Sequence, residues 1–173
     1  MGENSSPYWI VGQDGEPELK AIYERHYSCR RYKDGRQPKL FGGPGEKIIL
    51  TTPNRDVLFV WRKFKDMRLE EGVNCAVFRN ESKILSSNLI READTIADFC
   101  WPGERHYTYV RAAAVKSANP GYCFICAGWR HCGRTQGGLF ILERITILPN
   151  KPTLTIRQAY CFSQVEADRR FRR

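Results

Sequence analysis

The stretch Gly72–Asp98, GVNCAVFRNESKILSSNLIREADTIAD, decides the fold class. Its first eight residues, Gly72–Arg79, have the β-branched and aromatic composition of a strand. From Ser86 onward apolar residues recur at helical spacing, namely at Leu89, Ile90, Ala93, Ile96 and Ala97. Ser86 or Ser87 would cap this helix at its N-terminus. A strand followed by a short polar loop and an amphipathic helix predicts that a sheet and a helix pack together.

Further elements are expected on both sides of this unit. Composition and spacing predict helices at 18–27 and 117–128, and strands at 8–11, 47–52, 56–63, 106–110, 129–134 and 139–147. This order predicts an α+β fold with a mixed, mostly antiparallel central sheet flanked by helices. We expect a flexible lead-in over residues 1–18, one folded domain over 19–148, and a C-terminal extension with a basic tail over 149–173.

The overall composition excludes several classes of protein. The 173 residues are 42% hydrophobic and 12% aromatic, which excludes wholesale disorder. No apolar run approaches the roughly 18 residues that a membrane span needs, and the N-terminus lacks the order of a signal peptide. We therefore expect a soluble, cytoplasmic protein without a membrane partner. Its seven cysteines, an odd number, are expected to be reduced thiols.

The charge balance favours a polyanionic partner. Lys and Arg number 28 against 19 Asp and Glu, a net charge of +9. Arg30, Arg31 and Lys33 are the first candidates for contacts with nucleic acid. Arg62 and Lys63 are further candidates, because they lie in a run that interleaves aromatic rings with cations. A strand with one buried and one solvated face would give the same alternation.

Cysteines and a histidine near residue 126 invite a zinc interpretation. Cys123, Cys126 and His131 match the first spacings of a zinc knuckle, but the fourth ligand position falls on Gln136. Thiols at i and i+3 of a short helix also pack well as small apolar groups. We therefore expect core or inert thiols at these positions and consider zinc unlikely.

Four motifs, taken in order, resemble the Mom-like DNA-modification proteins of phages and prophages, a branch of the GNAT superfamily of N-acetyltransferases. The motifs are His26-Tyr27-Ser28, the strand Cys75–Glu81 leading to Leu85-Ser86-Ser87, the strand Tyr107–Val110, and Asn119-Pro-Gly-Tyr122 leading to Gly133. The resemblance covers roughly residues 23–143. It implies a GNAT-like sheet and makes 19–148 the catalytic domain.

The resemblance also implies a function. It implies an acyltransferase-type enzyme that modifies adenine at its exocyclic N6 amine in double-stranded DNA and thereby protects phage DNA from restriction in the host cytoplasm. Acetyl-CoA or a related acyl donor is the implied cofactor, and iron is the implied metal. Two alternatives stay open: a GNAT enzyme that acetylates a small-molecule or protein amine, and a non-catalytic nucleic-acid-binding module.

Site residues follow from the same motifs. The resemblance implies catalytic roles for His26, Tyr27, Ser86 and Tyr122, and metal binding by His26 and Tyr27. It implies cofactor binding by Arg79, Ser86 and Ser87. From its chemistry alone, a neutral imidazole at His26 could bind a metal or accept a proton, or it could be a histidine on a polar surface at a helix end. The hydroxyl of Ser86 could serve only as a helix cap.

The sequence departs from the family pattern at three places. Phe124 stands where many GNAT enzymes have a tyrosine, and the loop 79–87 lacks the glycines that hold the pyrophosphate of coenzyme A. Arg111 stands where the Mom-like pattern has an aspartate, which replaces a carboxylate with a positive charge. We still expect His26, Arg79, Ser86 and Tyr122 to share one crevice beside the middle strand.

Overall fold

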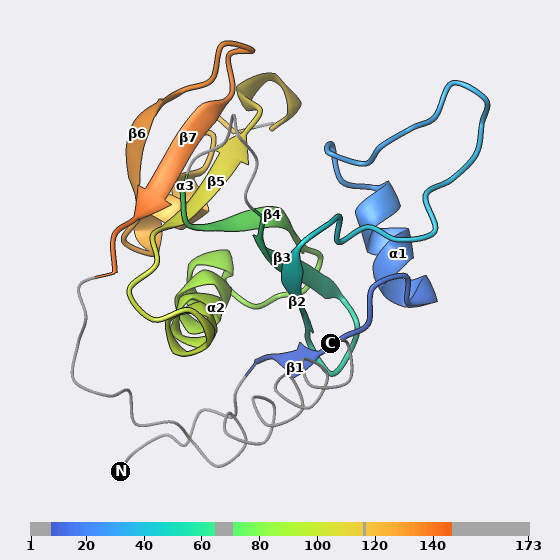
Figure 1. Cartoon of the computed structure of the whole chain (residues 1–173), viewed down its shortest axis with the longest axis horizontal. Coiled ribbons are helices and arrows are strands. Elements are labelled where there is room, and N and C mark those ends of the chain that lie inside the picture. Colours follow the sequence, from blue (N-terminus) through green and yellow to red (C-terminus); the bar gives the residue numbers. More distant parts are fainter. Residues whose placement is uncertain (1–7, 65–70, 116, 147–173) are drawn as a thin grey trace.

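A computed structural model describes residues 8–64, 71–115 and 117–146. In these ranges seven strands form one sheet, in the order β1-β2-β3-β4-β5-β7-β6 (Figure 1). The strands are β1 (Ile10–Val11), β2 (Glu46–Thr51), β3 (Val57–Lys63), β4 (Val73–Asn80), β5 (His106–Val110), β6 (Arg130–Arg134) and β7 (Phe140–Arg144). Neighbouring strands are antiparallel except β4 and β5, which are parallel. This confirms the predicted α+β class with a mixed, mostly antiparallel sheet.

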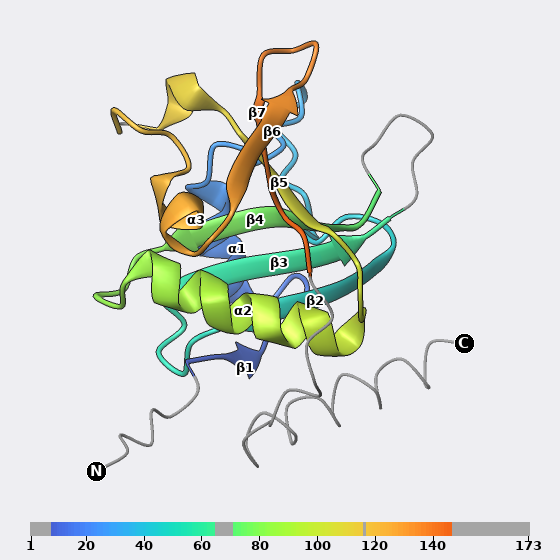
Figure 2. The same ribbon diagram turned by 90° about the vertical axis from the view of Figure 1, so that its left-hand side faces the viewer.

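Helices cover both faces of the sheet. The helix α1 (Pro17–Glu24) lies on one face, while α2 (Ser86–Cys100) and the short α3 (Tyr122–Cys126) lie on the other (Figure 2). Strand β3 is buried on both sides, because Leu58 and Val60 pack in the core under α1 whereas Phe59 and Trp61 pack in the core under α2. No helix within the described ranges is long and apolar enough to cross a membrane.

The strands β4 and β5, the only parallel pair of the described sheet, are paired at their N-terminal ends and separate toward their C-terminal ends. Strand β4 leads into α2, and α2 leads back to β5, as a parallel connection requires. The β4–β5 register runs from Val73–His106 to Cys75–Thr108. Beyond those pairs β4 continues to Asn80 and β5 to Val110. The sheet is therefore split at its centre, at the carboxyl ends of both parallel strands.

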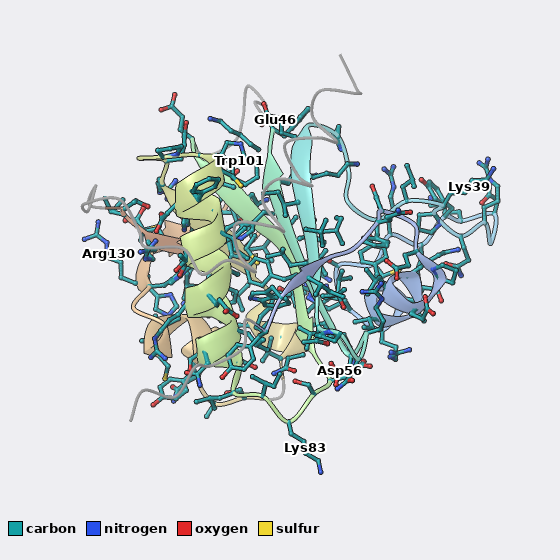
Figure 3. All side chains as sticks on the ribbon, turned by 90° about the horizontal axis from the view of Figure 1, so that it is seen from below. Lys39, Glu46, Asp56, Lys83, Trp101 and Arg130 are labelled. Carbon is teal, nitrogen blue, oxygen red and sulfur yellow. The ribbon has the colours of Figure 1, made fainter. Side chains whose placement is uncertain are left out.

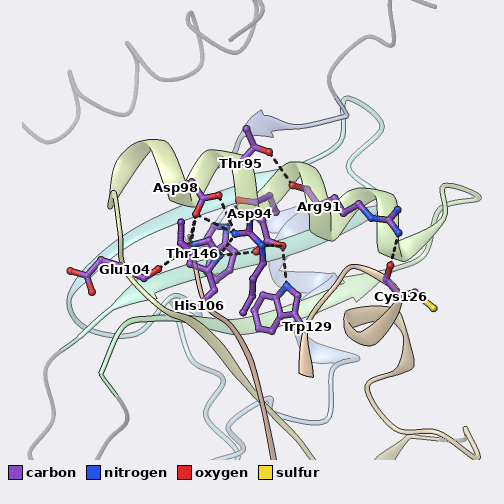
Figure 4. Close-up of polar contacts among 12 residues, drawn as sticks. Arg91, Asp94, Thr95, Asp98, Glu104, His106, Cys126, Trp129 and Thr146 are labelled. Atoms are coloured by element: carbon purple, nitrogen blue, oxygen red, sulfur yellow. Dashed lines mark hydrogen bonds and ion pairs between the residues drawn. The ribbon is translucent and has the colours of Figure 1, made fainter. Parts of the chain in front are cut away.

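A buried polar network fixes α2 against the C-terminal half of the sheet (Figure 4). The Asp94 carboxylate accepts the Trp129 indole N–H at 2.9 Å, and its other oxygen lies 2.8 Å from His106 Nδ1. One turn later, Asp98 accepts hydrogen bonds from Thr146 at 2.8 Å and from Arg144 at 3.0 Å. These hydrogen bonds hold β5 and β7 in place beside the split, although the second ring nitrogen of His106, Nε2, is buried without a hydrogen-bond partner.

Several local expectations differ from the structure, and the helix expected over 117–128 is shorter, Tyr122–Cys126. The predicted cap of α2 by Ser86 or Ser87 is wrong, because the N-cap is Leu85 and the helix has no side-chain cap hydrogen bond there. The flexible lead-in expected over residues 1–18 is ordered in its second half. Trp9 is buried, and its indole N–H donates to the Leu89 carbonyl. The helix α1 already begins at Pro17. The extension expected over 149–173 lies outside the described residues. A single 3-10 turn, η1 (Ala112–Ala114), was not expected.

Candidate functional site

A cavity of about 370 Å³ occupies the split between β4 and β5. Crevices at the carboxyl ends of parallel strands are common ligand sites, and this volume is near the lower end of their usual range. Its walls come from both strands, the segment after α1, the first residue of α2, η1 and the start of α3. They include His26, Tyr27, Cys75, Arg79, Asn80, Ser86, Thr108, Tyr109, Ala114, Gly121, Cys123 and Phe124.

His26 is a neutral, fully hydrogen-bonded side chain in one wall of this cavity. The backbone N–H of Ser28 donates to His26 Nδ1 at 3.2 Å, so Nδ1 carries no proton. The ring also hydrogen-bonds to the backbone of Phe78 in β4. Burial, together with the positive charge of Arg79, lowers the pKa of His26 to about 4. His26 therefore holds a fixed tautomer and does not present a free base to the cavity.

Tyr27 reaches the opposite strand. Its hydroxyl donates to the Tyr109 carbonyl at 3.1 Å and hydrogen-bonds to the backbone of Arg111. Both backbone groups follow the last β4–β5 pair, where β4 no longer reaches β5. Burial raises the pKa of Tyr27, so the phenol stays protonated. The adjacent His26 and Tyr27 thus bridge the two strands that the split separates.

Arg79 lies in the cavity wall at the end of β4 and is held by an internal carboxylate. Its Nε donates to Glu81 at 2.6 Å, and its Nη1 donates to the Arg25 carbonyl at 2.8 Å, just past α1. Arg25 donates two hydrogen bonds to the same carboxylate, at 2.8 and 2.6 Å. The hydrogen bond from Arg25, with help from Arg79, lowers the pKa of Glu81 to about 2. Two guanidinium groups therefore converge on one anionic group, which is supplied here by the protein itself.

Glu81 and Arg25 are site residues that the sequence reasoning missed. Glu81 stands two residues after Arg79, so an acidic residue beside a predicted phosphate-binding arginine was the available signal. Arg25 gave no local signal, since it is separated from Glu81 by 56 positions in the chain.

The loop between β4 and α2 is organised by Asn80. Its amide nitrogen donates to the Ile84 carbonyl and to Ser86 Oγ, at 2.7 and 3.0 Å. Its oxygen accepts the backbone N–H of Ser82 at 2.9 Å, the N–H of Ile84 donates to Ser82 Oγ, and that of Glu81 donates to Asp56. These backbone donors are already in use. The loop therefore does not fit the pyrophosphate of acetyl-CoA in the way the family resemblance implies.

The two serines at the start of α2 differ in exposure to the cavity. Ser86 lines the cavity and accepts a hydrogen bond from Asn80. Ser87 is buried and is not among the lining residues. Of the three residues expected to bind a cofactor, Arg79 and Ser86 therefore face the cavity.

The implied iron does not fit at His26 and Tyr27. His26 Nδ1 and the Tyr27 hydroxyl are both engaged in hydrogen bonds, and the neighbouring charge is the cation Arg79. Among the described residues, no group of three or more His, Cys, Asp or Glu side chains could hold a metal ion, and this includes Cys123, Cys126 and His131.

Tyr122 lies outside the cavity that contains the other expected residues. It is 59% exposed and lines a second hollow, between α3 and the β6–β7 hairpin. The structure thus brings together His26, Tyr27, Arg79 and Ser86 and places Tyr122 apart from them.

The expected nucleic-acid contacts fall in two different environments. Arg30, Arg31 and Lys33 are exposed in the long loop that follows Tyr27 and projects from the body of the protein, with Lys39 near its far end (Figure 3). Lys63, in contrast, is paired with Glu104 at 2.5 Å.

The run of aromatic rings and cations around Arg62 is a half-buried strand. Trp61 is fully buried and its indole N–H donates to Ala93 at 2.9 Å, so it offers no stacking face. The Arg62 guanidinium lies 5.9 Å from the ring centre of Phe64. Burial therefore decreases toward the end of β3, from the buried Trp61 to the half-buried Arg62 and Lys63 and the exposed Phe64, and the projecting loop is the better candidate for phosphate contacts.

No family model, curated protein or solved structure matches this chain. The features that bear on the function are the cavity, the Arg25 and Arg79 pair on Glu81, and the distribution of basic side chains.

Proposed function

We propose that this chain is a GNAT-like transferase that modifies a base in double-stranded DNA, with the N6 amine of adenine as the acceptor. One observation carries the proposal: the central parallel strands open into a cavity where His26, Tyr27, Arg79 and Ser86 converge. These residues come from two separate motifs of the resemblance. Such an enzyme would act in the host cytoplasm and protect phage DNA from restriction.

The walls and rim of the cavity define the ligand that it fits. The walls carry uncharged groups, including the neutral His26, the Tyr27 phenol and Ser86. The wall also includes Arg79, which shares the Glu81 carboxylate with Arg25, a residue outside the cavity lining. This arrangement suits a donor with an uncharged reactive end and an anionic body, because an anion could replace Glu81 between the two guanidinium groups.

The chain's own residues would position the reactants. Tyr27 and His26 keep the strands apart and shape the cavity, and the Ser86 hydroxyl can donate to an acyl oxygen at the start of α2. Because the backbone donors of Glu81, Ser82 and Ile84 in the loop after β4 are in use, the donor's anionic group is assigned to Arg79 and Arg25. A base inside a duplex is hidden, so the acceptor has to be flipped out of the stack.

Basic side chains of the projecting loop suit the proposed duplex DNA partner. Arg30, Arg31 and Lys33 lie in the loop that begins directly after Tyr27, and the net charge is +9. Contacts of these side chains to phosphates would supply affinity without sequence specificity.

Nucleoside mass spectrometry tests this function. DNA from cells that express the protein is digested to nucleosides and compared with DNA from cells that carry the empty vector. We expect a deoxyadenosine adduct only when the protein is expressed. Unmodified DNA, together with measurable binding of purified protein to duplex DNA, would overturn the enzymatic proposal.

A second candidate function is a non-catalytic nucleic-acid-binding module. The specific observation in its favour is that the side chains of His26, Tyr27 and Arg79 all have hydrogen-bond partners within the protein, so none of them is free to act on a substrate. In that case the cavity would be a remnant of the scaffold, and only the basic surface would act.

A further inference from the structure

A second hollow, of about 760 Å³, lies between α3 and the β6–β7 hairpin. One wall carries Tyr122 and Ile125 of α3, preceded by Asn119 and Pro120, and the other carries His131, Arg134 and Phe140. Strand β6 is the edge of the sheet, and all of its residues are exposed. A ligand could therefore enter this hollow from solvent without any rearrangement of the sheet.

The hollow offers flat stacking surfaces. Tyr122 is 59% exposed, an unusual degree for a large aromatic side chain. On the facing wall, the Arg134 guanidinium lies 4.3 Å from the centre of the Phe140 ring. The His131 ring meets the same Phe140 ring edge-on, with centroids 5.4 Å apart. Aromatic and guanidinium planes of this kind stack on nucleobases regardless of base identity.

The charge around the hollow is positive. Arg134 lies in its wall. The neighbouring Glu143 is neutralised, because Arg105 donates to it at 2.5 Å and Arg130 at 2.8 Å. None of the described residues that line the hollow is acidic. The hollow thus combines stacking faces with one cation, Arg134, that can bind a phosphate.

We infer that this hollow binds an unpaired nucleobase of a nucleic-acid strand, stacked against Tyr122, with Arg134 on a flanking phosphate. Asn119 in the rim can hydrogen-bond to a base edge. An acidic peptide would satisfy the cations but would leave the exposed ring faces without a matching partner. The inference deepens the proposed function, since a flipped or single-stranded base needs such a surface, and it rests on nucleic acid being the partner.

Binding of two fluorescent ten-nucleotide strands tests the inference. One strand is oligothymidylate, and the other has the same phosphates but abasic sugars throughout. Fluorescence anisotropy gives the dissociation constant of each strand for the wild type and for Tyr122→Ala. We expect Tyr122→Ala to weaken oligothymidylate binding by about fivefold or more, because stacking is lost, and to change abasic-strand binding by less than about twofold.

Two control variants separate stacking from charge and from general apolar surface. Leu85 is exposed and lies in neither the cavity nor the hollow, so Leu85→Ala is expected to leave both dissociation constants unchanged. Arg134→Gln is expected to weaken the binding of both DNA strands, because it removes a phosphate contact. Thermal unfolding of each variant checks that the fold is intact.

The outcomes distinguish this inference from the proposed function. An equal loss of affinity for the two strands in Tyr122→Ala, or no loss of affinity, would overturn the stacking site. Competition by a polyglutamate peptide that is as strong as competition by oligothymidylate would also overturn it. Base-dependent binding through Tyr122 without any DNA adduct in cells would instead overturn the enzymatic proposal and leave the stacking site standing.

Discussion

The ring of His26 packs on the ring of Tyr27 with their centroids 4.3 Å apart, and the two side chains hydrogen-bond to different strands of the sheet. His26 bonds to the backbone of Phe78 in β4, and Tyr27 donates to the Tyr109 carbonyl in β5. Neighbouring residues thus satisfy backbone groups on both sides of the split. This gives the His-Tyr motif a positioning role: it keeps the two parallel strands apart and the cavity open.

Removing the Tyr27 hydroxyl is expected to destabilise the fold. In Tyr27→Phe the Tyr109 carbonyl and the Arg111 N–H lose their hydrogen bonds to the phenol, so we expect the free energy of unfolding to fall by about 1 kcal/mol. Urea denaturation measures this change. Tyr32→Phe is the matched control, because Tyr32 is exposed in the projecting loop, and equal effects of the two substitutions would contradict the bridging role.

His26 is expected to make the protein less stable in mild acid. Its pKa is about 4 when folded and about 6.5 when unfolded, so below pH 6.5 the unfolded chain takes up a proton that the native state does not. This stability is present above pH 6.5 and is lost as the pH falls toward 4.

Urea denaturation of the wild type and of His26→Gln at pH 7.0 and 4.5 isolates this contribution. Between these two pH values we expect the wild type to lose about 2 to 3 kcal/mol more than the variant. Identical pH dependences would show that His26 has an ordinary pKa in the folded protein.

Glu81→Gln is expected to tighten the binding of phosphate-containing anions. The substitution removes the carboxylate that now occupies Arg79 and Arg25, so both guanidinium groups become available to a ligand. Calorimetric titration with inorganic pyrophosphate should give a dissociation constant at least about fivefold lower than that of the wild type.

Asp34→Asn is the matched control for Glu81→Gln. It neutralises a carboxylate that pairs with Arg36 in the projecting loop, away from the cavity. We expect it to leave pyrophosphate affinity near the wild-type value. An equal gain in both variants would mean that overall charge, and not the Arg25–Arg79 pair, controls anion binding.

The projecting loop is expected to contact DNA phosphates. Arg30→Gln combined with Arg31→Gln should weaken duplex binding and reduce the slope of log affinity against log salt by about 1.8, which corresponds to two phosphate contacts. Lys20→Gln combined with Lys83→Gln removes the same charge elsewhere and should leave the slope nearly unchanged. Equal slopes in the two double variants would exclude the loop as a specific contact surface.

Most of the fold could be predicted from the sequence, because its signals are local. The strand His106–Val110 matches its predicted bounds, and the start of α2 at Ser86 follows from the apolar spacing of the helix. The cap of α2 could not be predicted in this way. Asn80, six residues before Ser86, organises the loop, so the two serines are not needed as caps.

The candidate site was harder to predict, because it depends on the directions of side chains and on distant contacts. Tyr122 belongs to the same short motif as Cys123 and Phe124, but only the latter two face the cavity. A five-residue helix turns consecutive side chains to different sides, and the motif alone does not give its rotation. Arg25 and Glu81 are 56 residues apart in the chain, so the spacing of residues within a motif could not predict their contact.

Nucleoside mass spectrometry on two variants, each with one alanine of η1 replaced by tryptophan, tests most directly whether the cavity between β4 and β5 is the site of DNA modification. Ala113 and Ala114 are adjacent, exposed residues of η1, and of the two only Ala114 lines the cavity. We expect the deoxyadenosine adduct in cells with the wild type and with Ala113→Trp, and a loss of at least about tenfold with Ala114→Trp, whose side chain would fill the cavity. Equal adduct levels in the two variants, or no adduct with the wild type, would contradict the account.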